Sequence, residues 1–568
     1  MWVGGVLLAG VAALAIVAAL LAHRAEPYLR ARIIEGLQQR FRARVELDSF
    51  HLSVRNGLDG HWGVWAEGKG LRIWPPARVA GVEVPALPQA ANAKPMIELG
   101  QFRFHAPLIF ARGKPLHISV VELEGLNIDL PPRSHFEHPS LEPTPAPDLP
   151  QAVVPSARDF LRFGVDSVEC KNARLVLETS KPGKLPLKID IAHFKLTGVG
   201  SSPLIDPKHQ GPALSTLVMG FDAELTNPRP TGVIHTTGMF GPWIQGDLGE
   251  SPINGNYRFD HADLSDFKGI AGILSSTGHY QGTLRDLTVD GETDTPDFRL
   301  RPFDNPLPLH TKFHAKVDGT NGDTWLQPVD ATLAHSHFTA QGQVVRVLVQ
   351  DPGGTGQKQS VGHDIALKVD VDNGRIEDFL RLASHGETPL MTGAVTLKTT
   401  LHIPPGPAPV HERLQLKGSF VLDQAQFSSA KIQGNIEQLS LRGLGRPGDV
   451  KTTDPDSIGS KMEGDFELSG GVVKLPALTY SVPGAIIQLN GTYGVDGGAL
   501  DFTGYAKTQA TVSQMVGGWK GLLLKPLDRY LKKDGAGTEL PIHIRGTRAQ
   551  PEFGIDFNRM KGSSAAQR

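Results

Sequence analysis

Two histidines at alternate positions, His335 and His337, have the spacing in this chain that is most suggestive of metal binding. Residues two apart on a β-strand point to the same face, so the two rings could supply two ligands to a zinc ion. A zinc site needs a third and a fourth ligand, and the neighbouring sequence offers none. We therefore interpret both residues as surface histidines and predict no metal site.

The stretch 318–323, DGTNGD, has the composition of a calcium-binding loop. Gly322, however, occupies a position at which the EF-hand requires a side chain with an oxygen ligand. Asn321 followed by Gly322 is typical of the tight turn of a β-hairpin. The stretch therefore predicts a turn between two strands.

No sequence signature of catalysis or of cofactor binding is accompanied by the neighbouring residues that it requires. The segment 443–448, GLGRPG, matches the glycine spacing of a dinucleotide-binding loop, but Pro447 lies inside it and a polar loop follows where a helix should begin. No glycine-lysine pair continues into Ser or Thr, and neither GxSxG nor HExxH occurs. We predict no catalytic residue, no cofactor and no enzymatic activity.

Composition narrows the class of protein further. The 568 residues carry a formal net charge of -2, so no overall electrostatic attraction to nucleic acid is expected. Cys170 is the single cysteine, which excludes an intrachain disulfide and any CxxC redox or zinc site. The 64 glycines and 43 prolines suit a chain with many strand ends and turns.

Apolar and polar residues alternate along most of the chain, which predicts a mainly β protein built from repeating antiparallel hairpins. Strands with this period of two are predicted at 187–191, 540–544 and 553–557, among others. Three predicted strands near 365, 395 and 414 place these apolar residues on one face: Ile365, Leu367, Val369, Val395, Leu397, Leu401, Leu416, Phe420 and Leu422.

Such an apolar face has to be covered, because a large bare patch promotes aggregation. Helices, a second sheet or a bound ligand could cover it. The alternation fits two arrangements, β-sandwiches whose apolar faces meet and a single sheet that shelters lipid tails. The alternation alone does not distinguish them.

The N-terminal residues 3–22, VGGVLLAGVAALAIVAALLA, predict a transmembrane helix, since about 20 apolar residues match the hydrocarbon layer of a bilayer. The stretch is longer than a cleaved signal peptide requires. The arginines that follow this stretch favour a cytoplasmic location for the rest of the chain. Large domains, however, cross membranes largely regardless of charge, and we expect the rest of the chain to be exported. Residues 26–44 place Leu29, Ile33, Leu37 and Phe41 four apart, which predicts an amphipathic helix that caps the first sheet.

We predict five regions: a membrane anchor at 1–22, a helix with strands at 23–130, a proline-rich linker or loop at 131–157, repeated strands at 158–508, and a helical segment with a final hairpin and tail at 509–568. The segments DLSDFKGIAGIL and RIEDFLRLAS predict two short helices that form a weak internal repeat. A third helix, 512–531, is broken by Pro526 and is expected to pack Met515, Trp519, Leu522 and Leu523 over the last sheet.

Several of these features together resemble the AsmA-like family of bacterial envelope proteins. They are the apolar N-terminal helix running into EPYLRARIIEGLQQRFRARVELDSFHLSVRNG, the GLRIW that follows, and the closing PIHIRGTRAQPEFGID after an apolar helical stretch. The resemblance covers most of the chain as a pattern of spacing. It implies an anchor in the inner membrane, a body in the periplasm, and a long curved sheet whose concave apolar face shelters acyl chains, as in the related TamB-type lipid carriers.

The resemblance implies that the nine apolar residues named above form a lipid-binding groove. The expected partner is membrane lipid, with phospholipid first, conducted toward the outer membrane during envelope biogenesis. The alternative is an envelope-assembly or regulatory protein that binds a protein partner through β-sandwich domains and carries no lipid.

Overall fold

The computed structural model describes most residues from Glu26 to Ile555. Outside the described residues lie 1–25, 57–61, 75–76, 80–81, 85–93, 108–115, 131–162, 178–186, 201–217, 243–247, 351–357, 448–458, 517–524, 529–536 and 556–568, together with shorter gaps. These gaps contain the predicted membrane helix, the whole linker at 131–157, the C-terminal tail, and Trp519, Leu522 and Leu523. Within the part of the chain that is described, no helix combines the length and the apolar character needed to cross a membrane.

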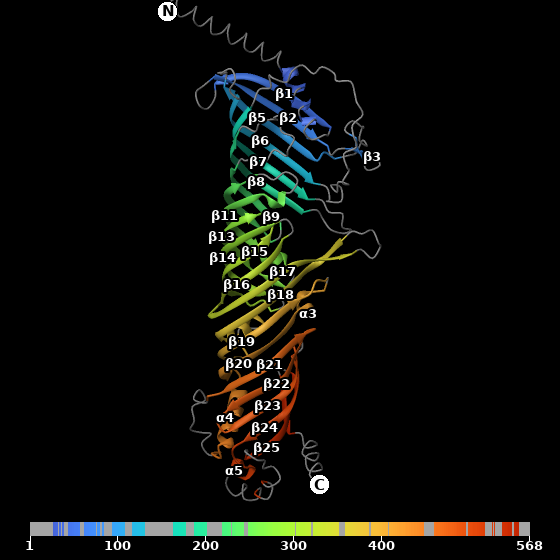
Figure 1. The fold of residues 1–568 in the computed structure, drawn as a ribbon. Helices are drawn as coiled ribbons and strands as arrows, with labels where there is room; N and C mark the ends of the chain where they lie inside the picture. The colour runs from blue at the N-terminus through green and yellow to red at the C-terminus, as the bar shows by residue number, and fades with distance from the viewer. Residues whose placement is uncertain are drawn as a thin grey trace, which may run out of the picture. The chain divides into compact units, whose positions relative to one another are not determined.

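The described chain is mainly β, as predicted (Figure 1). Twenty-four of its strands belong to one sheet that is mostly antiparallel, and the two remaining strands form a separate hairpin. The chain divides into two compact units, the first with residues 1–261 and 279–285 and the second with 262–278 and 286–568. The boundary lies inside the region predicted as repeated strands, 158–508.

The first unit contains an N-terminal helix and the strands up to β11. Residues 26–31, 33–35 and 37–38 are helical. The strands are β1 (Val45–Asn56), β2 (Trp62–Ile73), β3 (Ala77–Val79), β4 (Val82–Val84), β5 (Ile97–Pro107), β6 (Leu116–Leu130), β7 (Phe163–Leu177), β8 (Leu187–Gly200), β9 (Met219–Pro228), β10 (Thr231–Phe240) and β11 (Pro252–Asp263), with a short 3-10 helix η2 (Leu248–Glu250). Neighbouring strands pair in the order β1-β2-β5-β6-β7-β8-β9-β10, and the β6–β7 pair is parallel.

The N-terminal helix covers the beginning of this sheet, as predicted. Leu29, Ile33 and Ile34 pack against a cluster that includes the buried residues Leu47 and Phe102. The helix also reaches the free edge of β1: the Leu52 N–H donates to Glu26 Oε1 at 2.8 Å, and the Arg30 guanidinium donates to the Leu47 carbonyl. These side chains therefore satisfy backbone groups that an edge strand would otherwise leave open.

The second unit continues with the remaining strands, several of them joined by short helices. The strands are β12 (Ile270–Ala271), β13 (Ile273–Thr283), β14 (Asp286–Leu300), β15 (Leu307–Asp318), β16 (Asp323–Leu333), β17 (Ser336–Gln350), β18 (Lys358–Arg375), β19 (Met391–Ile403), β20 (Gln415–Phe427), β21 (Lys461–Ser469), β22 (Val472–Val482), β23 (Ala485–Gly494), β24 (Ala499–Thr508), β25 (Thr538–Thr547) and β26 (Pro551–Ile555). The helices are η3 (Leu264–Asp266), α2 (Ile376–Leu382), α3 (Val410–Arg413), α4 (Ala430–Gly443) and α5 (Val512–Val516).

From β14 to β26 each strand pairs antiparallel with the next one in the sequence. Connections therefore alternate between two edges of the sheet. The connections that hold α2, α4 and α5 follow β18, β20 and β24 and lie at one edge. The connection with α3 follows β19 and lies at the other. The turn predicted around Gly322 joins β15 to β16, as expected.

One of the three sequence predictions for helices needs correction. The helix predicted in DLSDFKGIAGIL is wrong beyond its first turn: only Leu264–Asp266 is helical, and Ile270–Ala271 forms β12, which pairs with Leu300 and Arg299 of β14. Pairing with an existing strand outweighs the helical pattern there. The second segment does form a helix, α2. In the third, Val512–Val516 is helical, and the Met515 sulfur accepts a hydrogen bond from Thr508 Oγ1 at 3.5 Å.

Candidate functional site

One face of the second unit is apolar across many consecutive strands. In the paired registers, Leu367 of β18 lies opposite Leu401 of β19, which lies opposite Leu416 of β20, and Leu416 lies opposite Leu468 of β21. All nine predicted groove residues lie on this face. We call this surface, from β18 to β25, the apolar face, and it contains Ile365, Leu367, Val369, Val371, Val395, Leu397, Thr399, Leu401, Ile403, Leu416, Gly418, Phe420, Leu422, Met462, Gly464, Phe466, Leu468, Leu478, Tyr480, Ile487, Leu489, Phe502, Ala506, Leu540, Ile542 and Ile544.

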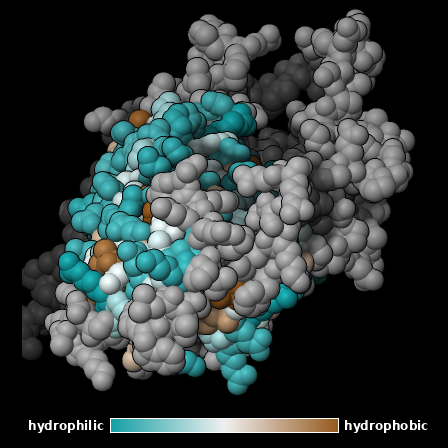
Figure 2. All heavy atoms as spheres, turned by 90° about the horizontal axis from the view of Figure 1, so that it is seen from below, coloured by the Kyte–Doolittle hydropathy of each residue, from teal (hydrophilic) through white to brown (hydrophobic). Residues whose placement is uncertain are grey.

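The opposite face carries the charges. Lys417 Nζ lies 2.6 Å from Glu467 Oε1, and His402 Nε2 lies 2.8 Å from Asp364 Oδ1. The hydrogen bond with Asp364 raises the pKa of His402. Among the described positions of the apolar face there is no Asp, Glu, Lys or Arg. Figure 2, which views the molecule from below, shows a described surface that is largely hydrophilic, with only small separate hydrophobic patches.

Among the described residues, helices cover one side of the apolar face and leave the other side uncovered. Ile376 and Phe379 of α2 and Ile436 and Leu439 of α4 pack against a cluster of buried residues. In this cluster Val371, Val395 and Leu422 are each 1% exposed. Val369, Leu397 and Phe420 lie at its margin and are partly buried. The predicted groove residues therefore divide into two that are buried under helices and seven that are not fully covered.

Polar contacts hold α2 in place at both of its ends. The buried Asp378 carboxylate accepts hydrogen bonds from Ser336 Oγ at 2.8 Å and from the His335 N–H at 3.0 Å. Asn305 Nδ2 donates to the carbonyls of Arg381 and Ser384 at 2.9 and 2.6 Å. Because Ser336 begins β17 and Asn305 precedes β15, α2 is fixed across the ends of several strands.

Toward the other edge of the sheet the apolar side chains are only half-buried. Ile365, Leu367, Leu401 and Leu416 retain partial exposure to solvent, as does Leu468. Apart from the β3–β4 hairpin, the described strands form no second sheet that could cover them. The sandwich arrangement, with a second sheet against this face, is thus not found in the described residues.

An open depression with a volume of about 510 Å³ lies on this uncovered part. Leu326, Leu367, Leu401 and Gly342 on the side of the apolar face line it, together with Lys368, Thr400 and His402 at the alternate positions of the same strands. Gly342 has φ +151, and a Cβ atom at this position would lie 2.0 Å from the Ala366 carbonyl oxygen. Only glycine fits there, and the absence of a side chain helps to form the hollow between three leucines.

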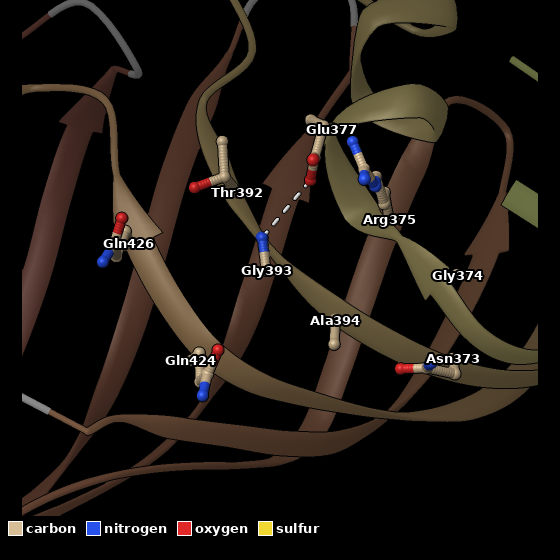
Figure 3. A pocket seen from close by; sticks show the side chains of 9 residues that line it. All are labelled: Asn373, Gly374, Arg375, Glu377, Thr392, Gly393, Ala394, Gln424 and Gln426. Carbon is tan, nitrogen blue, oxygen red and sulfur yellow. Dashed lines mark hydrogen bonds between the residues drawn. The ribbon is translucent and has the colours of Figure 1, made fainter. Parts of the chain in front are cut away.

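A second depression, of about 350 Å³, is polar (Figure 3). Arg375, Glu377, Gln424 and Gln426 are among its lining residues, close to irregular registers in β18 and β19. Glu377 Oε2 accepts a hydrogen bond from the Gly393 N–H at 3.3 Å, so the carboxylate satisfies a backbone group of the irregular strand. This arrangement stabilises the strand and adds no reactive group.

The residues considered for metal binding are not brought together. His335 lies in the turn before β17, not on a strand, and its Nδ1 lies 3.6 Å from Asp378. No group of three or more potential ligands forms among the described residues. Cys170 is 1% exposed, and burial raises the pKa of its thiol, which disfavours the reactive thiolate. The GLGRPG segment begins at the last residue of α4, and its residues Leu444, Gly445 and Pro447 lie in turns.

Sequence reasoning missed the helix α4, although signals for it are present. Ser429 caps the helix by accepting a hydrogen bond from the Ile432 N–H, and Ile432, Ile436 and Leu439 repeat with helical spacing.

No family model, curated protein or solved structure matches the chain. The argument for function therefore depends on the geometry of the apolar face.

Proposed function

We propose that this protein binds lipid on the apolar face and conducts it along the sheet. The observation that carries the proposal is a surface without any charged side chain over many strands, half-buried and covered by helices on one side only. Acyl chains would complete the cover of Leu367, Leu401 and Leu416. Lipid headgroups would remain in water.

The expected energetics support an apolar ligand over a polar one. Removing apolar surface from water contributes about 25 cal/mol per Å². A charged or polar group placed on this face would lose its hydration without gaining a partner, since the face offers few hydrogen-bonding side chains. Phospholipid, with two acyl chains and a polar end, is the ligand class that we propose, and its carriage between membranes of the envelope follows from the AsmA-like resemblance.

The N-terminal segment 3–22 is part of this proposal. As a membrane helix it would hold the sheet beside a bilayer and give it a source of lipid, with the body in the periplasm. The alternative is a protein partner that covers the same apolar face. It would use the same residues, so the test has to identify the molecule that contacts them.

Photo-crosslinking in cells provides this test. A photoreactive amino acid at Leu416 or Leu367 should capture phospholipid, whereas the same amino acid at Lys417 or Lys368, one residue away on the charged face, should not. Captured material is identified by mass spectrometry. Capture of protein alone at Leu416 and Leu367, or equal capture of lipid on both faces, would contradict the proposal.

A further inference from the structure

The first unit has an apolar face of its own. Leu123 of β6 lies opposite Cys170 of β7, and Cys170 lies opposite Phe194 of β8. This row continues through Ala223 of β9 to Thr236 of β10. Residues directly opposite one another share a face of the sheet. We call this surface the first-unit face, and its neighbouring rows contain Val121, Ile128, Val168, Ala173, Leu175, Ile189, Ile191, Leu196, Phe221, Leu225, Ile234 and Gly238.

The first-unit face is suited to acyl chains. None of the positions named above holds an Asp, Glu, Lys or Arg. Charged pairs lie on the opposite face, where His235 Nδ1 is 3.6 Å from Glu224 Oε2. Phe194, Phe221 and Leu225 are only partly buried. An apolar ligand would therefore gain free energy by covering them.

Three side chains with hydroxyl groups interrupt this apolar surface at β10, β11 and β13. Thr236 Oγ1 lies 2.7 Å from Tyr280 Oη. The rings of Tyr257 and Tyr280 have centroids 6.5 Å apart, with 32° between their planes. A Cβ atom on Gly255 would lie 2.8 Å from Tyr280 Oη, so this glycine makes room for the phenol hydroxyl. The three hydroxyl-bearing residues all belong to the first unit.

The hydrogen bonds determine which atom of the pair donates. Thr236 Oγ1 also lies 3.0 Å from the Asn256 carbonyl oxygen, which can only accept. Because threonine has a single hydroxyl proton, Thr236 donates to Asn256, and Tyr280 donates to Thr236. Among the described contacts no group donates to Tyr280 Oη, so this oxygen can still accept a hydrogen bond. Burial raises the pKa of Tyr280, which keeps the phenol protonated.

The fold does not need the Tyr280 hydroxyl, since Thr236 already has an acceptor for its proton. In a binding site with a mainly apolar lining, a few polar groups orient the ligand. Tyr280 Oη would accept a hydrogen bond from the N–H of an ammonium group, and such charge-assisted bonds are strong. The neighbouring tyrosine rings also attract a cation. These groups together favour a ligand whose polar end carries an ammonium with N–H donors.

We propose that Tyr280, together with Tyr257 and Thr236, binds the polar end of a phospholipid on the first-unit face and selects a head group with a primary ammonium, as in phosphatidylethanolamine. This inference rests on the proposed lipid-carrying function. The acyl chains would lie against the apolar rows, beside Phe221, while the ammonium donates to Tyr280 Oη. Phosphatidylcholine has the same net charge but no N–H on its nitrogen, so it cannot form this hydrogen bond.

Competition between these two lipids tests the selection. The full chain is reconstituted into vesicles of equal parts phosphatidylethanolamine and phosphatidylcholine with identical acyl chains. A photoreactive amino acid replaces Phe221, which lies opposite Gly238 on the first-unit face, and captured lipid is identified by mass spectrometry. Capture of phosphatidylethanolamine should exceed that of phosphatidylcholine about three- to tenfold, the effect of one net hydrogen bond. Tyr280→Phe should remove the preference and leave the total captured lipid unchanged. Equal capture by the native chain, or a preference that survives Tyr280→Phe, would overturn the proposal.

Two controls separate this inference from the function on which it rests. Tyr505→Phe makes the same change on the face of the second unit opposite its apolar face, where Tyr505 pairs with Gln488, and it should leave the preference unchanged. A photoreactive amino acid at Leu416 reports on lipid in the second unit. Lipid captured at Leu416 without a preference at Phe221 would reject the selection alone. No lipid at either position would reject the lipid-carrying function as well.

Methylation of the head group distinguishes a hydrogen bond from a limit on size. Dimethylphosphatidylethanolamine retains a single N–H, so it should be captured at Phe221 as well as phosphatidylethanolamine is. Capture that falls with each added methyl group would show that the site responds to size. A preference for phosphatidylcholine would show that the tyrosine rings bind a quaternary ammonium without help from Tyr280 Oη. Either result would contradict the proposal.

Discussion

Two leucines of the same strand and the same face provide the sharpest test of the uncovered surface. Leu422 is 1% exposed beneath α2 and α4, whereas Leu416, six residues earlier in β20, is half-buried on the part that helices do not cover. The substitution of either residue by Ala removes the same atoms. A fully buried leucine leaves a cavity that rigid neighbours cannot fill, and its loss costs about 2–5 kcal/mol.

For Leu416→Ala we expect a smaller loss, about 1 kcal/mol, because water, lipid or detergent can close around the shortened side chain. Hydrogen exchange of peptides from β18 to β20, followed by mass spectrometry, measures the opening free energy of this region. The two variants should differ by about 1–4 kcal/mol, where each 1.4 kcal/mol is about a factor of ten in the opening constant. Equal losses would mean that a protein layer covers Leu416, and the uncovered face would be refuted.

Three further predictions concern the contacts that hold this region. Asp378→Asn should weaken the anchorage of α2 by about 1–3 kcal/mol, since the carboxylate is 2% exposed and accepts two hydrogen bonds. Faster hydrogen exchange confined to residues 376–382 and their neighbours would show this loss, and unchanged hydrogen exchange would contradict it. Gly342→Ala should destabilise the second unit by about 2 kcal/mol or more in a denaturation assay. Gly434→Ala should stabilise it by about 0.5–1 kcal/mol in the same assay, because Gly434 lies inside α4 and no atom lies within 4 Å of the added Cβ. Because the pKa of His402 is raised, its pairing with Asp364 stabilises the fold fully below the unfolded pKa of about 6.5, and this contribution is lost as the pH rises through the folded pKa. His402→Gln should therefore lower the denaturation midpoint more at a pH of about 5.5 than at about 8.5, by a free energy of less than about 1 kcal/mol at this partly exposed site. An equal effect at both pH values would exclude the linkage.

The strands of this fold are predictable because alternation is a local property. The alternation of Ile365, Leu367 and Val369 with polar neighbours requires one face to be apolar whatever lies opposite. The strands β18, β19 and β20 and the shared face of their leucines follow directly. The tight turn at Gly322 was also predictable, since its residue types suit few other conformations.

The covering of that face depends on contacts between residues far apart in the sequence. Leu416 and Leu422 look alike in the sequence, and only the docking of α2 and α4 buries the second of them. The α2 anchor joins Asp378 to Ser336, 42 residues away, and no local pattern marks such a pair. The error over 269–274 has the same origin, because β12 exists through its pairing with β14.

The hydrogen bonds of the N-terminal helix to β1 have a consequence for how copies of the chain behave when they are crowded together. A sheet grows when an arriving strand pairs with an unoccupied edge, and repeated addition produces a polymer. At β1 the Glu26 carboxylate and the Arg30 guanidinium already occupy the Leu52 N–H and the Leu47 carbonyl. A second molecule would have to displace both side chains, and with them the helix, before it could extend the sheet from this end. The edge strand is thus protected against self-assembly by two charged residues of the helix that precedes it.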